Sequence, residues 1–334
     1  MNLHRPELWI LIATVLGGAW LFTRPEAPIE VQRKPERTAP AFAALPPGAQ
    51  LLGRVDFARL RQSRLGAALA GSGRGLAGLG SLTELCGFDP TEQIQELALA
   101  TPARAAGAEP ALGVVATGDF DPERLLDCVA KVIAKRGGTP SESRIGSFGS
   151  VRDRAREGAE VAVRSGGPVL VGEGAYFRAM IDAADGRGPT LLGDEAHATL
   201  REAVGGGGVA SVTFITKPGW LERWVTSEEA LGAPLGSVRA GALRLDVEPA
   251  PRVTLLLSCP SPEVCNGLGK WAEASQKRAR AGFLDELGVD PVSDAKLSVE
   301  ANAVRVVLVL DGAALQKLLL RLAVEEPAPT PSAQ

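Results

Sequence analysis

The sequence has few of the residues that build catalytic and metal sites. It contains two histidines and four cysteines in 334 residues, and no two cysteines have the spacing of a zinc knuckle or a redox pair. His4 lies in the N-terminal tail. His197 begins a polar helical segment, where we expect it to be solvated. His-Glu-x-x-His and Gly-x-Ser-x-Gly motifs are also missing, so we predict no catalytic residue, no metal site and no cofactor.

Aromatic side chains and an excess of positive charge are also lacking. Aromatic residues make up 4% of the chain and the net charge is −3, which disfavours nucleic-acid binding through the whole surface. We expect the basic cluster of Lys277, Arg278 and Arg280 to be a solvated helix face. A carboxylate-dependent hydrolase needs only two acids and stays an alternative, although aromatic platforms for sugar are scarce.

Acidic residues and glycines cluster in places that could suggest an ion or phosphate site. Acids alternate in residues 119–123, but the further ligands and central glycine of a calcium loop are missing. Asp121 followed by Pro122 predicts a helix N-cap instead, and Asp89 and Asp290, also followed by proline, suggest the same. The glycine runs 71–75 and 205–208 lack the Lys-Ser or Lys-Thr of a phosphate loop, so we predict that both are linkers.

The N-terminal segment Leu8–Phe22 (LWILIATVLGGAWLF) contains no charge. As a helix it would extend about 22 Å, short of the roughly 30 Å hydrocarbon core. Trp9 and Trp20 can serve as interfacial anchors for a slightly thinned bilayer. We therefore expect residues 8–22 to hold the chain in a bacterial cytoplasmic membrane as a single-pass anchor, with the folded part in the periplasm.

Two alternatives to a membrane anchor stay open. Residues 17–19 (GGA) offer small side chains for a signal peptidase, so cleavage would release a secreted protein. A buried core helix is the third interpretation. The proline-rich residues that follow predict an extended spacer. The resulting domain organisation is 1–23 anchor or signal peptide, 24–47 spacer, 48–204 first lobe, 209–324 second lobe and 325–334 disordered tail.

The four cysteines, Cys86, Cys128, Cys259 and Cys265, form an even set. In an exported protein such a set predicts two structural disulfides. Cys259 and Cys265 can meet locally, where a strand ends and a helix begins. Cys86 and Cys128 would then join two helices across the intervening strands. Four buried free thiols are the alternative.

The pattern of apolar residues predicts an α+β fold built from two related sheet-and-helix lobes. Residues 87–90 (GFDP) and 288–291 (GVDP) are each followed by a strand, a turn, an apolar strand and a helix, which suggests an internal duplication. Expected strands are 51–55, 94–100, 111–117, 145–152, 160–164, 169–172, 210–215, 237–247, 253–258, 295–299 and 303–310. Expected helices are 57–69, 122–135, 176–184, 194–204, 262–280 and 314–324.

One stretch resembles a known family. Residues 168–184 (PVLVGEGAYFRAMIDAA), followed by 188–192 (GPTLL), are similar to a segment of an uncharacterised bacterial family of exported, membrane-anchored repeat proteins. In that family a glycine-ended strand leads into a helix, a small-residue turn and a further helix. The resemblance covers a small part of the chain. It implies export and a repeat architecture and carries over no functional residues.

Trp220 and Trp224 lie one helical turn apart in the segment WLERW. A core-facing stripe is the ordinary interpretation, and a partner-binding or membrane-interface face is the functional one. The sequence thus favours a membrane-anchored periplasmic interaction or scaffolding protein without catalytic activity. The alternatives are an exported carboxylate-dependent hydrolase and a periplasmic binder of lipid or another small apolar ligand.

Overall fold

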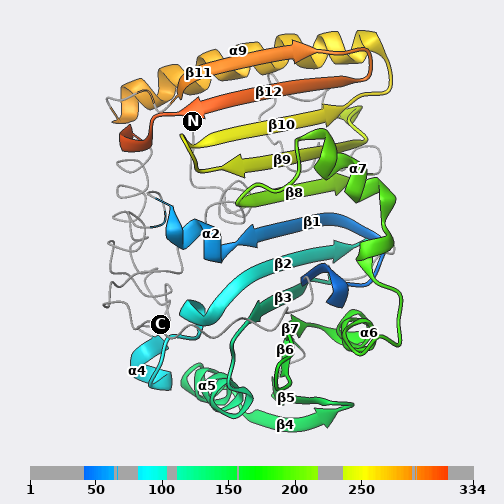
Figure 1. Cartoon of the computed structure of the whole chain (residues 1–334), viewed down its shortest axis with the longest axis vertical. Helices are drawn as coiled ribbons and strands as arrows, with labels where there is room; N and C mark the ends of the chain where they lie inside the picture. Colours follow the sequence, from blue (N-terminus) through cyan, green and yellow to red (C-terminus); the bar gives the residue numbers. More distant parts are fainter. Residues whose placement is uncertain are drawn as a thin grey trace, which may run out of the picture.

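A computed structural model describes residues 41–63, 66, 82–103, 111–155, 158–216, 236–287, 290 and 292–314. The chain forms a mixed helix-and-sheet structure, which confirms the predicted α+β class (Figure 1). The predicted membrane segment, most of the spacer, the glycine run 71–75, the Trp220–Trp224 stripe and the C-terminal tail lie outside the described residues. No helix in the described part combines the length and apolar character needed to span a membrane.

Twelve strands form a single antiparallel sheet in the order β11-β12-β10-β9-β8-β1-β2-β3-β7-β6-β5-β4 (Figure 1). Strand β1 pairs with β8 from Leu51↔Phe214 to Val55↔Ala210, which joins strands β1–β7 to strands β8–β12. The strands are β1 Ala49–Asp56, β2 Ile94–Pro102, β3 Gly113–Gly118, β4 Pro140–Ile145, β5 Phe148–Asp153, β6 Glu160–Val163, β7 Val169–Gly172, β8 Ala210–Ile215, β9 Ala240–Asp246, β10 Arg252–Ser258, β11 Val292–Val299 and β12 Ala303–Leu310.

Helices cover both faces of the sheet because successive strand side chains point to opposite sides. Val115 of β3 packs in the cluster of α6, whereas the next residue, Ala116, packs with α5. Likewise Leu256 of β10 packs with α7, and Leu257 packs with α9. The helices are α2 Phe57–Gln62, α4 Leu82–Cys86, α5 Pro122–Lys135, α6 Gly174–Ala184, α7 Glu195–Ala203 and α9 Pro262–Leu287, with 3₁₀ turns η2 Ala41–Ala44, η3 Pro90–Gln93 and η4 Leu191–Gly193.

The two faces carry different sets of helices. Leu52 of β1 packs against η2 and α6 in one cluster, and Val55 packs against α2 in another. We call the side with η2, α6 and α7 the α6–α7 face, and the side with α2, α5 and α9 the α5–α9 face. The arginine-lined pocket described below lies on the α6–α7 face.

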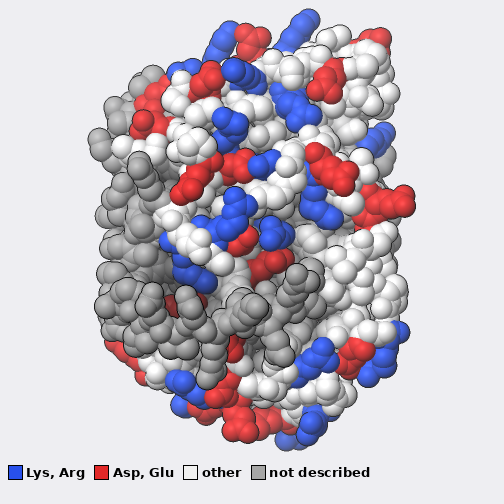
Figure 2. All heavy atoms as spheres, in the orientation of Figure 1, with Lys and Arg blue, Asp and Glu red and all other residues white. Residues whose placement is uncertain are grey.

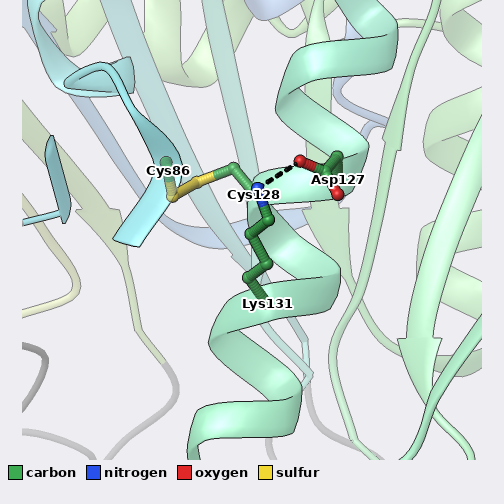
Figure 3. The surroundings of a disulfide bond; sticks show 4 residues. All are labelled: Cys86, Asp127, Cys128 and Lys131. Atoms are coloured by element: carbon green, nitrogen blue, oxygen red, sulfur yellow. Dashed lines mark ion pairs between the residues drawn. A yellow bond between two sulfur atoms is a disulfide. The ribbon is translucent and has the colours of Figure 1, made fainter. Parts of the chain in front are cut away.

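Two disulfides form, with the pairing that the sequence predicts. Cys86 of α4 is bonded to Cys128 of α5, with 4.8 Å between their Cα atoms (Figure 3). Cys259 follows β10 and is bonded to Cys265 in the first turns of α9, with a Cα–Cα distance of 5.6 Å. Cys265 is fully buried. The first bond ties two helices together, and the second fixes the entry into the longest described helix.

Two predicted elements are wrong in detail. The strand expected at 145–152 begins at Phe148, because Gly146 adopts a φ of +59° and residues 146–147 form a two-residue turn that joins it to the unpredicted strand β4, with Ile145 paired to Phe148. Asp290 does not cap a helix. It precedes strand β11, where its carboxylate accepts the N–H of Val292 at 2.9 Å and forms an ion pair with Arg280 at the far end of α9.

The basic cluster on α9 is partly neutralised, as a solvated helix face would be. Lys277 pairs with Glu273 one turn earlier at 2.9 Å, and Arg280 is paired with Asp290. The side chain of Arg278 lies outside the described residues. Two of the three basic residues therefore have acidic partners on or next to the same helix.

Candidate functional site

Three polar residues form a row across the middle of the sheet. Arg54 of β1 lies directly opposite Ser211 of β8, and Ser211 lies directly opposite Arg244 of β9. Directly opposed residues on neighbouring strands point to the same face. Arg54 shares its face with Leu52, two residues away, so the row lies on the α6–α7 face. Two guanidinium groups therefore flank one hydroxyl group.

Helix α7 covers this row and completes a pocket. It contacts β8 and β9, its Leu200 and Ala203 pack in one cluster with Ala242 of β9, and it brings Arg201 to the side of Arg54 and Arg244. The pocket has a volume of about 270 Å³. We call it the arginine pocket. Its other lining residues are Phe42, Ala198, Glu202, Val204, Gly206, Gly207 and Ser211.

The glycine run 205–208 ends α7 and forms one wall of the pocket. Gly205, Gly206 and Gly207 have φ values of +94°, +58° and +50°, a region that other residues rarely adopt. The N–H groups of Gly205 and Gly206 donate to the carbonyls of Glu202 and Arg201, each at 2.8 Å. The run connects two elements, as predicted. It is also the C-terminal turn of helix α7, and its backbone lines the arginine pocket.

Two of the three arginines are held by carboxylates. Arg54 Nε donates to Glu96 Oε1 at 3.0 Å. Arg244 Nη2 donates to Asp246 Oδ1 at 2.7 Å, and its Nη1 donates to the carbonyl of Val204 at 3.2 Å. The side chains of Arg54 and Arg244 are 24% and 22% exposed. Both guanidinium groups are thus fixed in position while solvent still reaches them.

Arg201 lacks such a partner. Its Nη1 is buried and has no hydrogen-bond partner in the described part of the chain, and its guanidinium stacks 4.9 Å from the ring of Phe42. Burial lowers the pKa of Arg201, and the nearby charge of Arg54 lowers it further, against the opposing effect of Asp194 and Glu202. Arginine nonetheless stays charged in proteins. The pocket therefore contains one cation whose charge is not neutralised by an ion pair.

The sequence does not reveal this site, because its members come from three separate parts of the chain. A local signal was present. Arg54 and Asp56, like Arg244 and Asp246, form an Arg-x-Asp pair inside an apolar strand, and residues two apart share one face. A buried strand that carries such a pair presents a fixed guanidinium. The strand order, which brings the two pairs together on either side of β8, is not visible in the sequence.

His197 is buried, so the prediction that it is solvated is wrong. It has no exposed surface, Nε2 lies 2.9 Å from the carbonyl of Ala49 and Nδ1 lies 2.7 Å from Thr213 Oγ1. Because a carbonyl can only accept, Nε2 carries a proton, and in the neutral ring Nδ1 accepts from the threonine hydroxyl. Both ring nitrogens are used to join α7 to the sheet.

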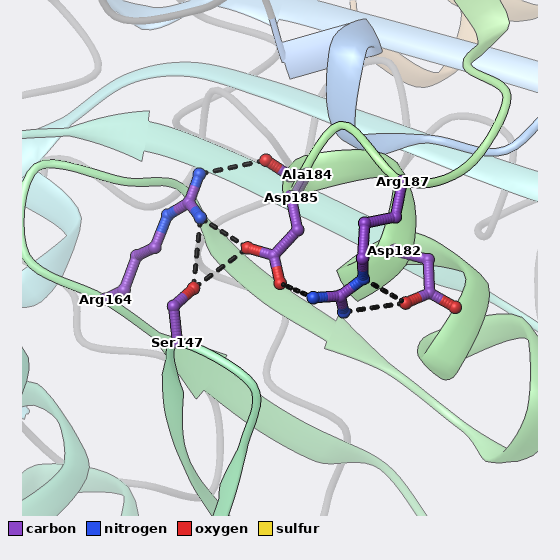
Figure 4. Close-up of polar contacts among 6 residues, drawn as sticks. All are labelled: Ser147, Arg164, Asp182, Ala184, Asp185 and Arg187. Atoms are coloured by element: carbon purple, nitrogen blue, oxygen red, sulfur yellow. Dashed lines mark hydrogen bonds and ion pairs between the residues drawn. The ribbon is translucent and has the colours of Figure 1, made fainter.

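A network of charged groups joins the hairpin β4–β5 to the end of α6 (Figure 4). The Asp185 side chain, only 9% exposed, lies between Arg164 and Arg187, and Arg187 Nη1 is 3.0 Å from Asp185 Oδ2. Ser147 Oγ donates to the same carboxylate at 2.9 Å, and Arg164 also donates to the carbonyl of Ala184. The bonds of Arg164 and Ser147 to the end of α6 join separate elements of the fold, which indicates a structural role.

The buried carboxylate of Glu160 is also paired. It accepts from Ser150 Oγ at 2.7 Å and from Arg178 Nη2 at 3.1 Å. Asp121 caps α5 as predicted, since its carboxylate accepts the N–H groups of Glu123 and Arg124. Within the described residues, no three His, Cys, Asp or Glu side chains are grouped so that they could hold a metal ion.

Charge on the face drawn in Figure 2 is mixed. Basic and acidic side chains alternate over the described surface and form no broad area of one sign. A nucleic-acid site requires a continuous basic stripe, and this face has none among the described residues. Trp220 and Trp224, the predicted partner-binding residues, lie outside the described residues.

Comparison with known proteins identifies no family. No family model and no curated protein matches the sequence. A solved structure described as "Structure of crystal form I of TP0453" is similar with a TM-score of 0.42 and 10% identity, over 86% of this chain and 98% of that chain. A similarity of this size supports no conclusion about family or function.

Proposed function

We propose that this chain is an exported bacterial protein, held at the cytoplasmic membrane by residues 8–22, that acts in the periplasm as an interaction or scaffolding protein without catalytic activity. The observation that carries the proposal is the pair of disulfides, which uses all four cysteines of the chain. Structural disulfides form and persist in oxidising compartments and are rare in the cytosol.

The N-terminal sequence supports the membrane part of the proposal. The uncharged run at 8–22 is followed by a proline-rich spacer, 24–47, which would separate the folded part from the bilayer. Cleavage after residues 17–19 would give a secreted protein with the same folded part. Both forms place the cysteines outside the cytoplasm.

The use of the buried ionisable groups supports a role without catalysis. His197, Glu160 and Asp185 all bond to neighbouring elements of the fold. The arginine pocket contains a single carboxylate, Glu202, whereas a carboxylate-dependent hydrolase requires two.

An internal duplication is also part of the proposal, with lobes 48–204 and 209–324. Strands β2 and β3, and likewise β11 and β12, are antiparallel neighbours, and each pair follows one of the two Asp-Pro motifs. The two copies would differ in their neighbouring strands, because β11 lies at the edge of the sheet whereas β2 also pairs with β1. The matching order of elements supports a common origin for the two pairs.

Cell fractionation and N-terminal sequencing test the anchor. The full chain should sediment with membranes, resist extraction by alkaline carbonate and begin at residue 1 or 2. A soluble periplasmic protein that begins near residue 20 would contradict the anchor and support cleavage. Recovery in the cytosol would contradict export altogether.

Affinity capture from membranes tests the interaction role. We expect a reproducible partner with the wild-type chain and its loss when Trp220 and Trp224 are both replaced by alanine. Replacement of Trp271 by alanine provides a matched control. Trp271 lies on the described helix α9, and its indole packs in the core beside Leu268. An unchanged partner set in the Trp220/Trp224 variant would argue against that face.

A further inference from the structure

One arginine of the pocket is left without an ion pair, while the other two are paired. Asp56 and Glu96 flank Arg54, and Asp246 pairs with Arg244. Arg201 has no ion pair within the described residues, and its Nη1 is buried without a hydrogen bond. Glu202, the carboxylate in the lining, is exposed, so solvent and salt screen its charge.

The rest of the lining suits a small apolar body. Phe42 and Val204 are buried apolar side chains, and Ala198 adds a methyl group to the lining. Ser211 Oγ makes no hydrogen bond in the described part of the chain and is free to donate. The volume of about 270 Å³ equals that of about nine liquid waters and is near the lower end for small-molecule sites.

These features favour a carboxylate over a phosphate. The planar guanidinium matches the two oxygens of a carboxylate, and one negative charge would pair with the one arginine that has no ion pair. A phosphate monoester carries about two negative charges at neutral pH. Its second charge would meet no further unpaired arginine in the lining, which also contains the carboxylate of Glu202.

We propose that the arginine pocket binds a small organic monocarboxylate, with its carboxylate on Arg201 and Ser211 and its apolar body against Phe42, Ala198 and Val204. Binding would give the guanidinium of Arg201 the ion-pair partner that it lacks among the described residues. It would also relieve the repulsion between Arg201 and Arg54. This proposal uses described residues alone and does not depend on the membrane anchor or on a protein partner.

Calorimetric titration of the full chain, purified with its disulfides intact, tests the ligand chemistry. Isovalerate, the neutral amide isovaleramide and inorganic phosphate are each titrated at the same total ionic strength. We expect saturable binding of isovalerate with a Kd on the order of 1 mM. Both isovaleramide and phosphate should bind at least tenfold more weakly than isovalerate. The neutral amide lacks the charge of the charge-assisted hydrogen bond, and phosphate does not match the single unpaired arginine in charge. Binding of isovaleramide or of phosphate as tight as that of isovalerate, or no saturable binding of isovalerate, would overturn the proposal.

Three variants test the location of the site. Arg201→Gln removes the unpaired charge and Ser211→Leu fills the pocket without changing charge, and each should weaken isovalerate binding at least tenfold. Arg144→Gln, on the exposed edge strand β4, removes an equal charge far along the sheet and should leave binding unchanged. Thermal unfolding midpoints identify any variant that fails to fold, in which case the wild-type ligand series decides. Binding that persists in folded Arg201→Gln, or falls equally in Arg144→Gln, would refute the site.

Discussion

Tyr176 on α6 is the one tyrosine in the chain, and its hydroxyl is buried without a hydrogen-bond partner among the described residues. Burial raises its pKa to about 12 from the ordinary value of 10. The phenol packs beside Gly113 of β3, where an added Cβ would collide with the ring. This close approach excludes water from the hydroxyl and keeps the phenol neutral.

The Tyr176 titration predicts a pH dependence of stability. Because the folded pKa is raised, stability is fully present below about pH 10 and falls as pH rises toward 12, by an amount on the order of 2 kcal/mol. Phenolate absorbance should titrate near pH 12 in the folded protein and near 10 in urea. Tyr176→Phe should abolish this pH dependence. A folded-state midpoint near 10 would show that the hydroxyl is solvated.

His197 predicts a second residue-scale effect. His197→Leu leaves the carbonyl of Ala49 and the hydroxyl of Thr213 without their partner, so the free energy of unfolding should fall by about 3 kcal/mol. Thr213→Val alone should cost about 1 kcal/mol. In urea unfolding, the double variant should lose less than the sum of the two by at least about 0.5 kcal/mol, because the two residues are in contact. Additive losses would mean that the two side chains do not interact.

The role of a residue could be predicted where its hydrogen-bond partners are close along the chain. It could not be predicted where the partners are far away. Asp121 was predicted as a helix cap, because its partners lie two and three residues away. His197 was not predicted as buried, since it bonds to Thr213, 16 residues away, and to Ala49, 148 residues away. Its position in a polar segment gave no sign of these partners.

At the scale of elements, the two disulfides close loops of very different length. Cys86 and Cys128 are 42 residues apart, and Cys259 and Cys265 are six apart. A longer loop loses more entropy in the unfolded chain when it is closed, so removing the first bond should cost about 4 kcal/mol and removing the second about 2 kcal/mol.

Paired Cys→Ala variants in urea unfolding measure the two disulfide contributions. The wild-type protein after reduction serves as the reference for loss of both bonds. The first pair should lower the unfolding midpoint more than the second. The reverse order would indicate that the local bond at the start of α9 matters for reasons other than loop entropy.

Most elements could be predicted from the sequence because their signals are local. The apolar run and cap of α5 and the strand pair β9–β10 were found on that basis. Strand β4 was missed, because its sequence, PSESRI, contains one large apolar side chain, at its end, and shows no apolar alternation. Helix α9 extends beyond its expected end at 280 to Leu287 and continues through Gly282.

At the scale of the molecule, the sheet order was not predictable. The pairing of β1 with β8 joins residues about 160 positions apart, such as Leu51 and Phe214, and no local pattern specifies such a partner. The arginine pocket depends on this pairing, because β8 lies between Arg54 and Arg244. A site assembled across strands is therefore visible only once the sheet is known.

The oxidation state of the four cysteines tests export most directly. Cells that produce the full chain are lysed into excess of a high-mass maleimide, with and without prior reduction. We predict no mass shift before reduction and four additions after it, whereas a variant that lacks residues 1–23 should stay in the cytosol and react at once. Free thiols in the full-length chain at the moment of lysis would contradict the proposal that this protein folds outside the cytoplasm.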